Sequence, residues 1–251
     1  MPEAIIFSDA HISDDNESGI ARLEAFLTQV CPSARRVFIL GDLFDFWFGP
    51  AQATLKPYSR VLEAILALAR SGVEVTFYRG NRDCYITGAI AREHGFRLVD
   101  DYSIESICGL RVLLCHGDKL CANDKNYHRA SAIVRNPLIR FILTRLPVSL
   151  ARELALFYRR WSVRAIASKS RHVLGIDDDA VRAHFALGAD AIVAGHTHCG
   201  GRREVDTPGG KCLIYTLGDF GTDGSYLECG AEGFVARTFG DAAVAPASDE
   251  R

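Results

Sequence analysis

Aspartate, asparagine and histidine residues recur in five short stretches that lie far apart along a chain of 251 residues. Carboxylate, amide and imidazole groups together suit borderline-to-hard divalent ions such as Mn²⁺, Fe²⁺, Co²⁺ or Zn²⁺. The set contains no cysteine, which argues against a structural zinc site, because such sites are usually cysteine-rich. The candidate ligands are Asp9, His11, Asp42, Asn81, His116, His196 and His198.

These ligands are too many for one tetrahedral ion but suit a pair of ions that share a bridging carboxylate. Two-metal sites hold their ions roughly 3.5–4 Å apart and stabilise both the attacking and the leaving oxygen of a phosphoryl transfer. Asp9 and His11 are expected on the same side of an extended segment, where both could bind one ion. His196 and His198 could do the same, or could supply one imidazole to each ion.

Each stretch directly follows a short apolar run. Such runs, apolar at nearly every position, predict strands that are covered on both faces. Ligands of open α/β sheets bind at the carboxyl ends of strands, so the five stretches are expected to converge. A glycine before Asp42, Asn81 and His196 allows a sharp turn out of each strand. The predicted strands are Ala4–Phe7, Val37–Leu40, Val73–Tyr78, Arg111–Cys115 and Ala191–Ala194.

Amphipathic helices are predicted between the early strands, over residues 20–30 and 61–68, and Gly72 is expected to end the second of them. Near the C-terminus, Lys211–Leu217 and Gly233–Thr238 look like antiparallel strands with no helix between them. The order of elements therefore predicts an α/β sandwich with a mixed sheet.

Composition narrows the class of protein. Hydrophobic residues make up 48% and charged residues 24%, and the net charge is −2, which is typical of a globular protein and excludes intrinsic disorder and a nucleic-acid-binding tail. No stretch approaches the roughly 18–20 apolar residues of a membrane-spanning helix. The N-terminus has no basic region of the signal-peptide type, so a cytoplasmic location is expected. The eight cysteines are then expected to be free thiols.

Residues 135–171 differ from the rest, because they contain nine basic side chains and one acidic one, Glu153. Two apolar stripes, one around Phe141 and one from Leu150 to Trp161, are separated by Pro147. The pattern predicts a pair of basic amphipathic helices inserted into the sandwich. Such helices can lie on an anionic membrane, or they can form an ordinary helical hairpin with solvated arginines.

The five stretches occur in the order Asp-x-His, Gly-Asp, Gly-Asn-Arg-Asp, His-Gly and Gly-His-x-His, and over residues 9–198 they resemble the calcineurin-like metallophosphoesterases. The resemblance implies a four-layered α/β/β/α sandwich over residues 1–240. The last residues, 241–251, are mostly small or polar, and a frayed tail is expected there. The resemblance also implies two sets of ligands with Asp42 as the bridge: Asp9, His11, Asp42 and His198 for one ion, and Asp42, Asn81, His116 and His196 for the other.

Further blocks, Gly41–Gly49, Gly80–Asp83, His116–Cys121 and Ser168–Ser170, are similar to the branch of this family that hydrolyses UDP-2,3-diacylglucosamine to UMP and 2,3-diacylglucosamine 1-phosphate in lipid A synthesis. This resemblance implies two Mn²⁺ ions and a helical lid, residues 120–175, that holds the acyl chains. Implied catalytic residues are Asp42, Asn81, Arg82 and His116. Implied substrate contacts are Asn81, Arg82, Asp124, Tyr127, Ser162, Ile166, Lys169 and His196.

Arg82 stands where many members of the superfamily have a histidine that assists the leaving group. Arginine cannot act as a general acid near neutral pH, since its pKa exceeds ~12, so we expect it to bind phosphate and to stabilise charge in the transition state. Three features depart from the family pattern. Relatives usually have leucine at the position of Ala10 and asparagine at that of Ile166, and the stretch 200–203 also differs. These departures leave the exact lipid open.

The resemblance further implies a UDP-linked diacylated glucosamine lipid as partner and peripheral association with the inner membrane on its cytoplasmic side. We expect the protein to be a monomer. We also expect it to bind no nucleic acid, since the basic segment is interleaved with leucine and phenylalanine. The alternatives are another calcineurin-like phosphoesterase that acts on a nucleotide or soluble phosphodiester, and a non-catalytic scaffold.

Overall fold

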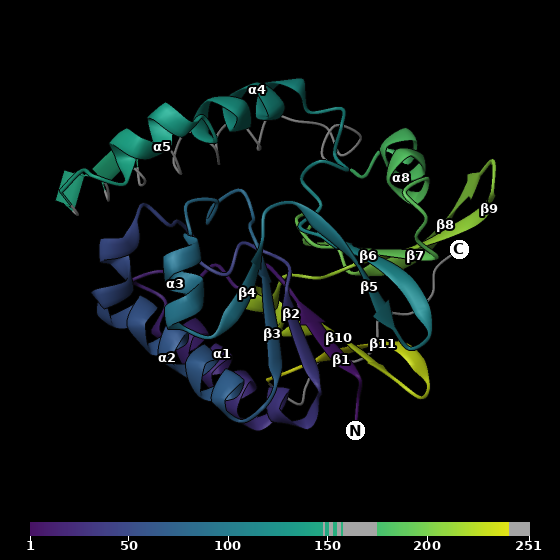
Figure 1. Ribbon diagram of the computed structural model, residues 1–251, viewed down its shortest axis with the longest axis horizontal. Coiled ribbons are helices and arrows are strands. Elements are labelled where there is room, and N and C mark those ends of the chain that lie inside the picture. Colours follow the sequence, from purple (N-terminus) through teal and green to yellow (C-terminus); the bar gives the residue numbers. More distant parts are fainter. Residues whose placement is uncertain (148, 151–152, 155–156, 158–174, 241–251) are drawn as a thin grey trace.

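A computed structural model describes residues 1–147, 149–150, 153–154, 157 and 175–240 (Figure 1). Its strands form two sheets. The first has the order β11-β10-β1-β2-β3-β4, with bounds Gly233–Thr238, Ser225–Gly230, Ala4–Phe7, Arg36–Ile39, Glu74–Tyr78 and Phe96–Val99. The second has the order β5-β6-β7-β9-β8, with bounds Tyr102–Ile107, Leu110–Cys115, Ala191–Ala194, Gly210–Thr216 and Gly201–Thr207.

Alternating side chains of the buried strands build separate parts of the core. In β1, Ile5 and Phe7 belong to the cluster with helices α1 (Glu17–Gln29) and α2 (Lys56–Arg70). Ala4 and Ile6 belong instead to the cluster that joins the two sheets. Because successive side chains of a strand point to opposite faces, a strand covered on both faces is apolar throughout.

The outer face of the second sheet is covered by helix α8, Asp178–Phe185, whose Val181 packs with Leu113 of β6 and Ile192 of β7. Figure 1 shows the resulting order of helices, first sheet, second sheet and helix. The expected α/β/β/α sandwich is therefore confirmed.

The mixed character predicted from the order of elements is present in both sheets of the sandwich. In the first, β1 to β4 are parallel, and β10 and β11 are antiparallel to their neighbours. In the second, β6, β7 and β9 are parallel, flanked by antiparallel β5 and β8. The two predicted C-terminal strands, β9 and β11, lie in different sheets. Strand β9 forms a hairpin with β8 in the second sheet, and β11 forms one with β10 in the first. The apolar pattern predicted neither β8 nor β10.

Shorter elements complete the fold. They are 3₁₀ helices at Cys31–Ser33 and Pro50–Thr54, α3 at Gly88–Glu93 and α9 at Phe220–Asp223. All eight cysteines are free thiols, as expected. None of the helices in the described part of the chain is long and apolar enough to cross a membrane.

Helix α4, Lys125–Val134, precedes the basic segment, and helix α5, Pro137–Leu143, lies within it. Both lie along the edge of the molecule opposite the N-terminus (Figure 1). The chain breaks between them because Asn136 caps α5 through its side chain and proline occupies the first position of that helix. Helix α4 was not among the predicted elements. Of the second predicted stripe, Leu150, Leu154 and Phe157 are described and exposed, whereas Trp161 and the predicted frayed tail lie outside the described residues.

Candidate metal centre

The loops that leave β1, β2, β3, β6 and β7 meet at the carboxyl ends of the two sheets. Backbone hydrogen bonds join the first two loops, because Asp9 N–H donates to the Gly41 carbonyl and His11 N–H to the Asp42 carbonyl, both at 3.1 Å. The buried carboxylate of Asp83 joins the next pair, since it accepts from the N–H of Leu43 and of Gly80, each at 2.8 Å. The convergence expected from the sequence is therefore present in the structure.

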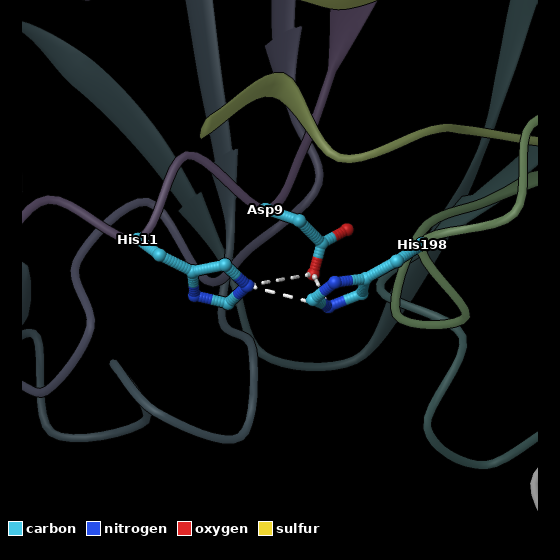
Figure 2. Close-up of side chains that lie close together, drawn as sticks. All are labelled: Asp9, His11 and His198. Carbon is cyan, nitrogen blue, oxygen red and sulfur yellow. Dashed lines mark hydrogen bonds and ion pairs between the residues drawn. The ribbon is translucent and has the colours of Figure 1, made fainter. Parts of the chain in front are cut away.

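One group of ligand atoms contains Asp9, His11 and His198 (Figure 2). The Nε2 atoms of the two histidines are 3.3 Å apart. Asp9 Oδ1 lies 3.4 Å from His198 Nε2 and 3.8 Å from His11 Nε2. Three possible ligand atoms, from the β1 and β7 loops, are thus directed toward one point.

A second group contains Asp9, Asp42 and His116. His116 Nε2 lies 3.7 Å from Asp42 Oδ1, 3.0 Å from Asn81 Oδ1 and 3.2 Å from His196 Nδ1. The other ring nitrogen of His116 donates to the Leu40 carbonyl at 2.8 Å, an arrangement that leaves Nε2 free to accept or to bind an ion. All seven predicted ligands therefore lie in or beside these two groups. Asp9 belongs to both groups, and the bridging role of Asp42 stays a prediction.

The backbone of the predicted ligands is unusual. Among the described residues, six besides glycine have a positive φ, and five of these are predicted ligands: Asp9, His11, Asp42, His196 and His198. The extended segment expected for Asp9 and His11 is therefore wrong, since their φ angles are 57° and 48°. Such conformations cost of order 1–3 kcal/mol each and cluster at functional sites. The turn out of each strand, rather than strand alternation, brings these side chains together.

The two oxygens of the Asp9 carboxylate have different surroundings. Oδ2 accepts hydrogen bonds from Ser8 Oγ at 2.5 Å and from the His196 backbone N–H at 3.0 Å. Among the described residues, no hydrogen bond reaches Oδ1, although Asp9 is fully buried. An unsatisfied buried carboxylate oxygen is costly, and a cation bound beside it would remove that cost. The oxygen and imidazole donors fit a pair of borderline divalent ions.

The pKa values of the site reflect this crowding of charge. Burial alone would raise the pKa of Asp9, but the nearby imidazoles, with His198 foremost, lower it below its usual range. Contacts with Asp219 and Asp9 raise the pKa of His198 to about 10. Burial and the neighbouring His116 lower the pKa of His196 to about 4. Burial and the nearby Asp42 raise the pKa of Asp83 to about 7.

The predicted substrate contacts differ in their surroundings. Arg82 Nη1 donates to Asp45 Oδ1 at 2.6 Å, and its Nε lies 3.5 Å from Asp42 Oδ2, so its guanidinium lies beside the candidate metal centre. The Tyr127 ring lies 5.6 Å from the His196 ring, and its hydroxyl donates to Asp118 at 3.0 Å. Asp124 caps α4 by accepting from the Tyr127 N–H. Ser162, Ile166 and Lys169 lie outside the described residues.

Three aspartates that hold the site together were not among the predicted site residues: Asp83, Asp118 and Asp219. Asp83 and Asp118 lie within stretches that the sequence had singled out. Asp219 Oδ2 lies 2.9 Å from His198 Nδ1. A signal for it exists in the sequence, since Gly218 and Asp219 follow the apolar end of β9, just as Gly41 and Asp42 follow β2.

Two helix-covered sheets with a cluster of carboxylate, amide and imidazole groups at their strand ends define a metal-dependent phosphoesterase. The chain belongs to the calcineurin-like phosphoesterase family, whose sequence pattern matches residues 4–200.

Similar proteins cover nearly the whole chain. UDP-2,3-diacylglucosamine hydrolase from Edwardsiella ictaluri is 32% identical over 232 residues, which are 91% of this chain and 89% of that protein. The protein of the same name from Neisseria meningitidis serogroup B is 34% identical over 94% of this chain and 97% of its own length. A solved dimetal phosphatase from Danio rerio is 13% identical over 96% of this chain and all of that one, with a TM-score of 0.49.

Proposed function

We propose that the protein hydrolyses the diphosphate of UDP-2,3-diacylglucosamine, giving UMP and 2,3-diacylglucosamine 1-phosphate for lipid A synthesis. The observation that carries this proposal is the similarity, over nearly their full length, to hydrolases named for that substrate. The cluster at the strand ends supports it, because it offers the donors that a phosphoesterase needs.

We assign two divalent ions, with Mn²⁺ as the proposed metal, to this cluster. Asp9, His11, Asp42 and His198 would hold one ion, and Asp42, Asn81, His116 and His196 the other. When bound, such ions lower the pKa of water and neutralise charge on phosphate oxygens.

The protein's own groups would bind and orient the diphosphate. Arg82 remains charged at any physiological pH, and its guanidinium, next to Asp42, can donate to phosphate oxygens as negative charge develops there. The group that leaves when the diphosphate is cleaved is itself a phosphate anion, which needs little protonation. Arg82 can therefore replace the histidine that serves as an acid in other members of the family.

Helices α4 and α5 would belong to a lid, residues 120–175, that holds the acyl chains and contacts the cytoplasmic face of the inner membrane. Exposed apolar side chains support this proposal: Leu138 is 65% exposed, Phe141 54% and Ile142 48%. Arg145, also exposed, stacks over the Phe141 ring with 3.6 Å between its Cζ and the ring centroid. Apolar side chains beside arginines are typical of helices that lie in a membrane interface.

The function is tested by direct assay. The purified protein is expected to release UMP from UDP-2,3-diacylglucosamine in the presence of Mn²⁺, to lose this activity completely with a chelator, and to regain it when Mn²⁺ is restored. Release of UMP is followed by chromatography, with bis-(p-nitrophenyl) phosphate as the soluble comparison substrate. Failure to cleave the lipid, together with rapid cleavage of the soluble diester, would favour the alternative of a phosphoesterase for small substrates.

Membrane association is tested by sedimentation with vesicles that contain phosphatidylglycerol. Leu138→Asp is expected to weaken binding by about tenfold or more, because burying a leucine contributes roughly 1.5–3 kcal/mol. Leu187→Asp is the matched control, since Leu187 is 46% exposed but follows α8 rather than lying in the lid. Equal binding by the two variants would argue against an apolar contact through α5.

A further inference from the structure

Asp219 forms two contacts through its two carboxylate oxygens. Oδ1 accepts from the Thr222 N–H at 3.1 Å and so caps the short helix α9. Oδ2 lies 2.9 Å from His198 Nδ1. Asp219 therefore links α9 directly to a predicted metal ligand in the loop after β7.

The contact with Asp219 determines which nitrogen of His198 is free. A carboxylate can only accept, so His198 Nδ1 carries the proton and donates to Oδ2. A histidine binds a metal only through a neutral ring, and in that form the lone pair is on Nε2, the atom that lies 3.4 Å from Asp9 Oδ1 and 3.3 Å from His11 Nε2. Figure 2 shows the His198 ring with Asp9 and His11.

The same short helix also holds the loop that carries Asp9 and His11. Gly221 N–H donates to the Asp9 carbonyl at 3.0 Å, and Phe220 N–H to the Ser8 carbonyl at 3.3 Å. A Cβ atom at Gly221 would lie 2.6 Å from the Ala10 carbonyl oxygen, so the two segments approach as closely as glycine allows. Helix α9 thus fixes both sides of the group formed by Asp9, His11 and His198.

We propose that Asp219 is a positioning residue that orients His198 and thereby sets the affinity of one of the two metal ions, the one assigned to Asp9, His11, Asp42 and His198. This inference rests on the metal centre proposed above. The second ion should be nearly independent of Asp219, because no described contact joins Asp219 to Asn81, His116 or His196. Groups that orient a metal-binding histidine typically contribute about 10- to 100-fold to metal affinity.

The test is calorimetric titration of the metal-free protein with Mn²⁺. In Asp219→Asn, the amide has one oxygen and cannot both cap α9 and accept from His198. One of the two binding steps is expected to weaken about 10- to 100-fold, and the other to stay within about threefold. His198→Ala identifies the step, since it removes the ligand itself. Asp219→Ser is a second variant, because serine still caps a helix but is too short to reach the ring.

Asp223→Asn is the matched control. It makes the same change in the same helix, and its amide oxygen can still accept from the Ser225 N–H, as Asp223 Oδ1 does at 2.9 Å. This variant should bind both ions like the unaltered protein. Unchanged binding by Asp219→Asn and Asp219→Ser would overturn the inference. Equal weakening of both Mn²⁺-binding steps, together with a lower melting temperature of the metal-free protein, would also overturn the inference, since that result indicates a structural role for Asp219. An unaltered protein that binds no Mn²⁺ would instead refute the metal centre itself.

Discussion

Replacing Asp42 with alanine is expected to abolish nearly all Mn²⁺-dependent release of UMP. Asp42 is 2% exposed, its Oδ1 lies 3.7 Å from His116 Nε2 and accepts from the Arg82 N–H at 2.9 Å. As the predicted bridge, Asp42 would bind both ions. Removing it should therefore lower the activity by more than the roughly 10- to 100-fold that follows from removing a group that only supports a ligand. Initial rates and bound manganese, measured on the same preparation, check the prediction.

Asp179→Ala is the control for a lost carboxylate. The Asp179 side chain is 89% exposed and pairs with Arg182 on the surface of α8, a type of contact that contributes little. This variant should keep its activity and its manganese. Turnover by Asp42→Ala at the rate of the unaltered protein would contradict the assignment of Asp42 to the metal centre.

The second large effect is expected for Gly80→Ala, which adds one methyl group beside Asp42. A Cβ atom at this position would lie 2.1 Å from Asp42 Oδ1 and 2.4 Å from the Asp42 backbone nitrogen. Either the carboxylate or the loop after β2 must move. Overpacking of this kind typically costs roughly 1–3 kcal/mol of stability, and a displacement of about 1 Å at a reacting centre can cost about 100-fold in rate. We expect both losses, seen as a lower melting temperature and a lower kcat.

Gly209→Ala makes the same change in the turn between β8 and β9, where an added Cβ would meet no atom within 4 Å. Its melting temperature and kcat should match those of the unaltered protein. If Gly80→Ala were as stable and as active as Gly209→Ala, the close approach of the β2 and β3 loops could not be what positions Asp42.

Much of the fold was predictable where burial is complete. Strands β1, β2, β3, β6 and β7 were expected within a few residues of their observed bounds, because most of their residues are buried and nearly every position of each run is apolar. Strands β5 and β8 were not expected, since most of their side chains are at least partly exposed. Half of the residues of β10 are buried, and this strand still went unpredicted. Its neighbours β1 and β11 were both predicted, but the pairing that makes it a strand is not a local property of the sequence.

The site shows the same division. The seven candidate ligands could be predicted from the sequence, because each lies in a stretch that directly follows an apolar strand. Five such stretches in one chain have few explanations other than a shared site. Asp219 was not predicted from the sequence, although its carboxylate lies as close to the His198 ring as any predicted ligand does. Its role depends on α9 folding back against the loop after β1, where Phe220 contacts Ser8 and Gly221 contacts Asp9, residues 212 positions apart in the sequence.

The order and chemistry of the polar residues determined, from the sequence alone, a metal-dependent hydrolase of the calcineurin-like type. Tertiary structure decided how those residues meet: left-handed backbone at Asp9 and His11 instead of an extended segment, and one carboxylate oxygen of Asp9 that receives no hydrogen bond from the described residues. The physical reason is that residue type and strand pattern are local, whereas the direction of a side chain at a strand end depends on which distant backbone packs against it.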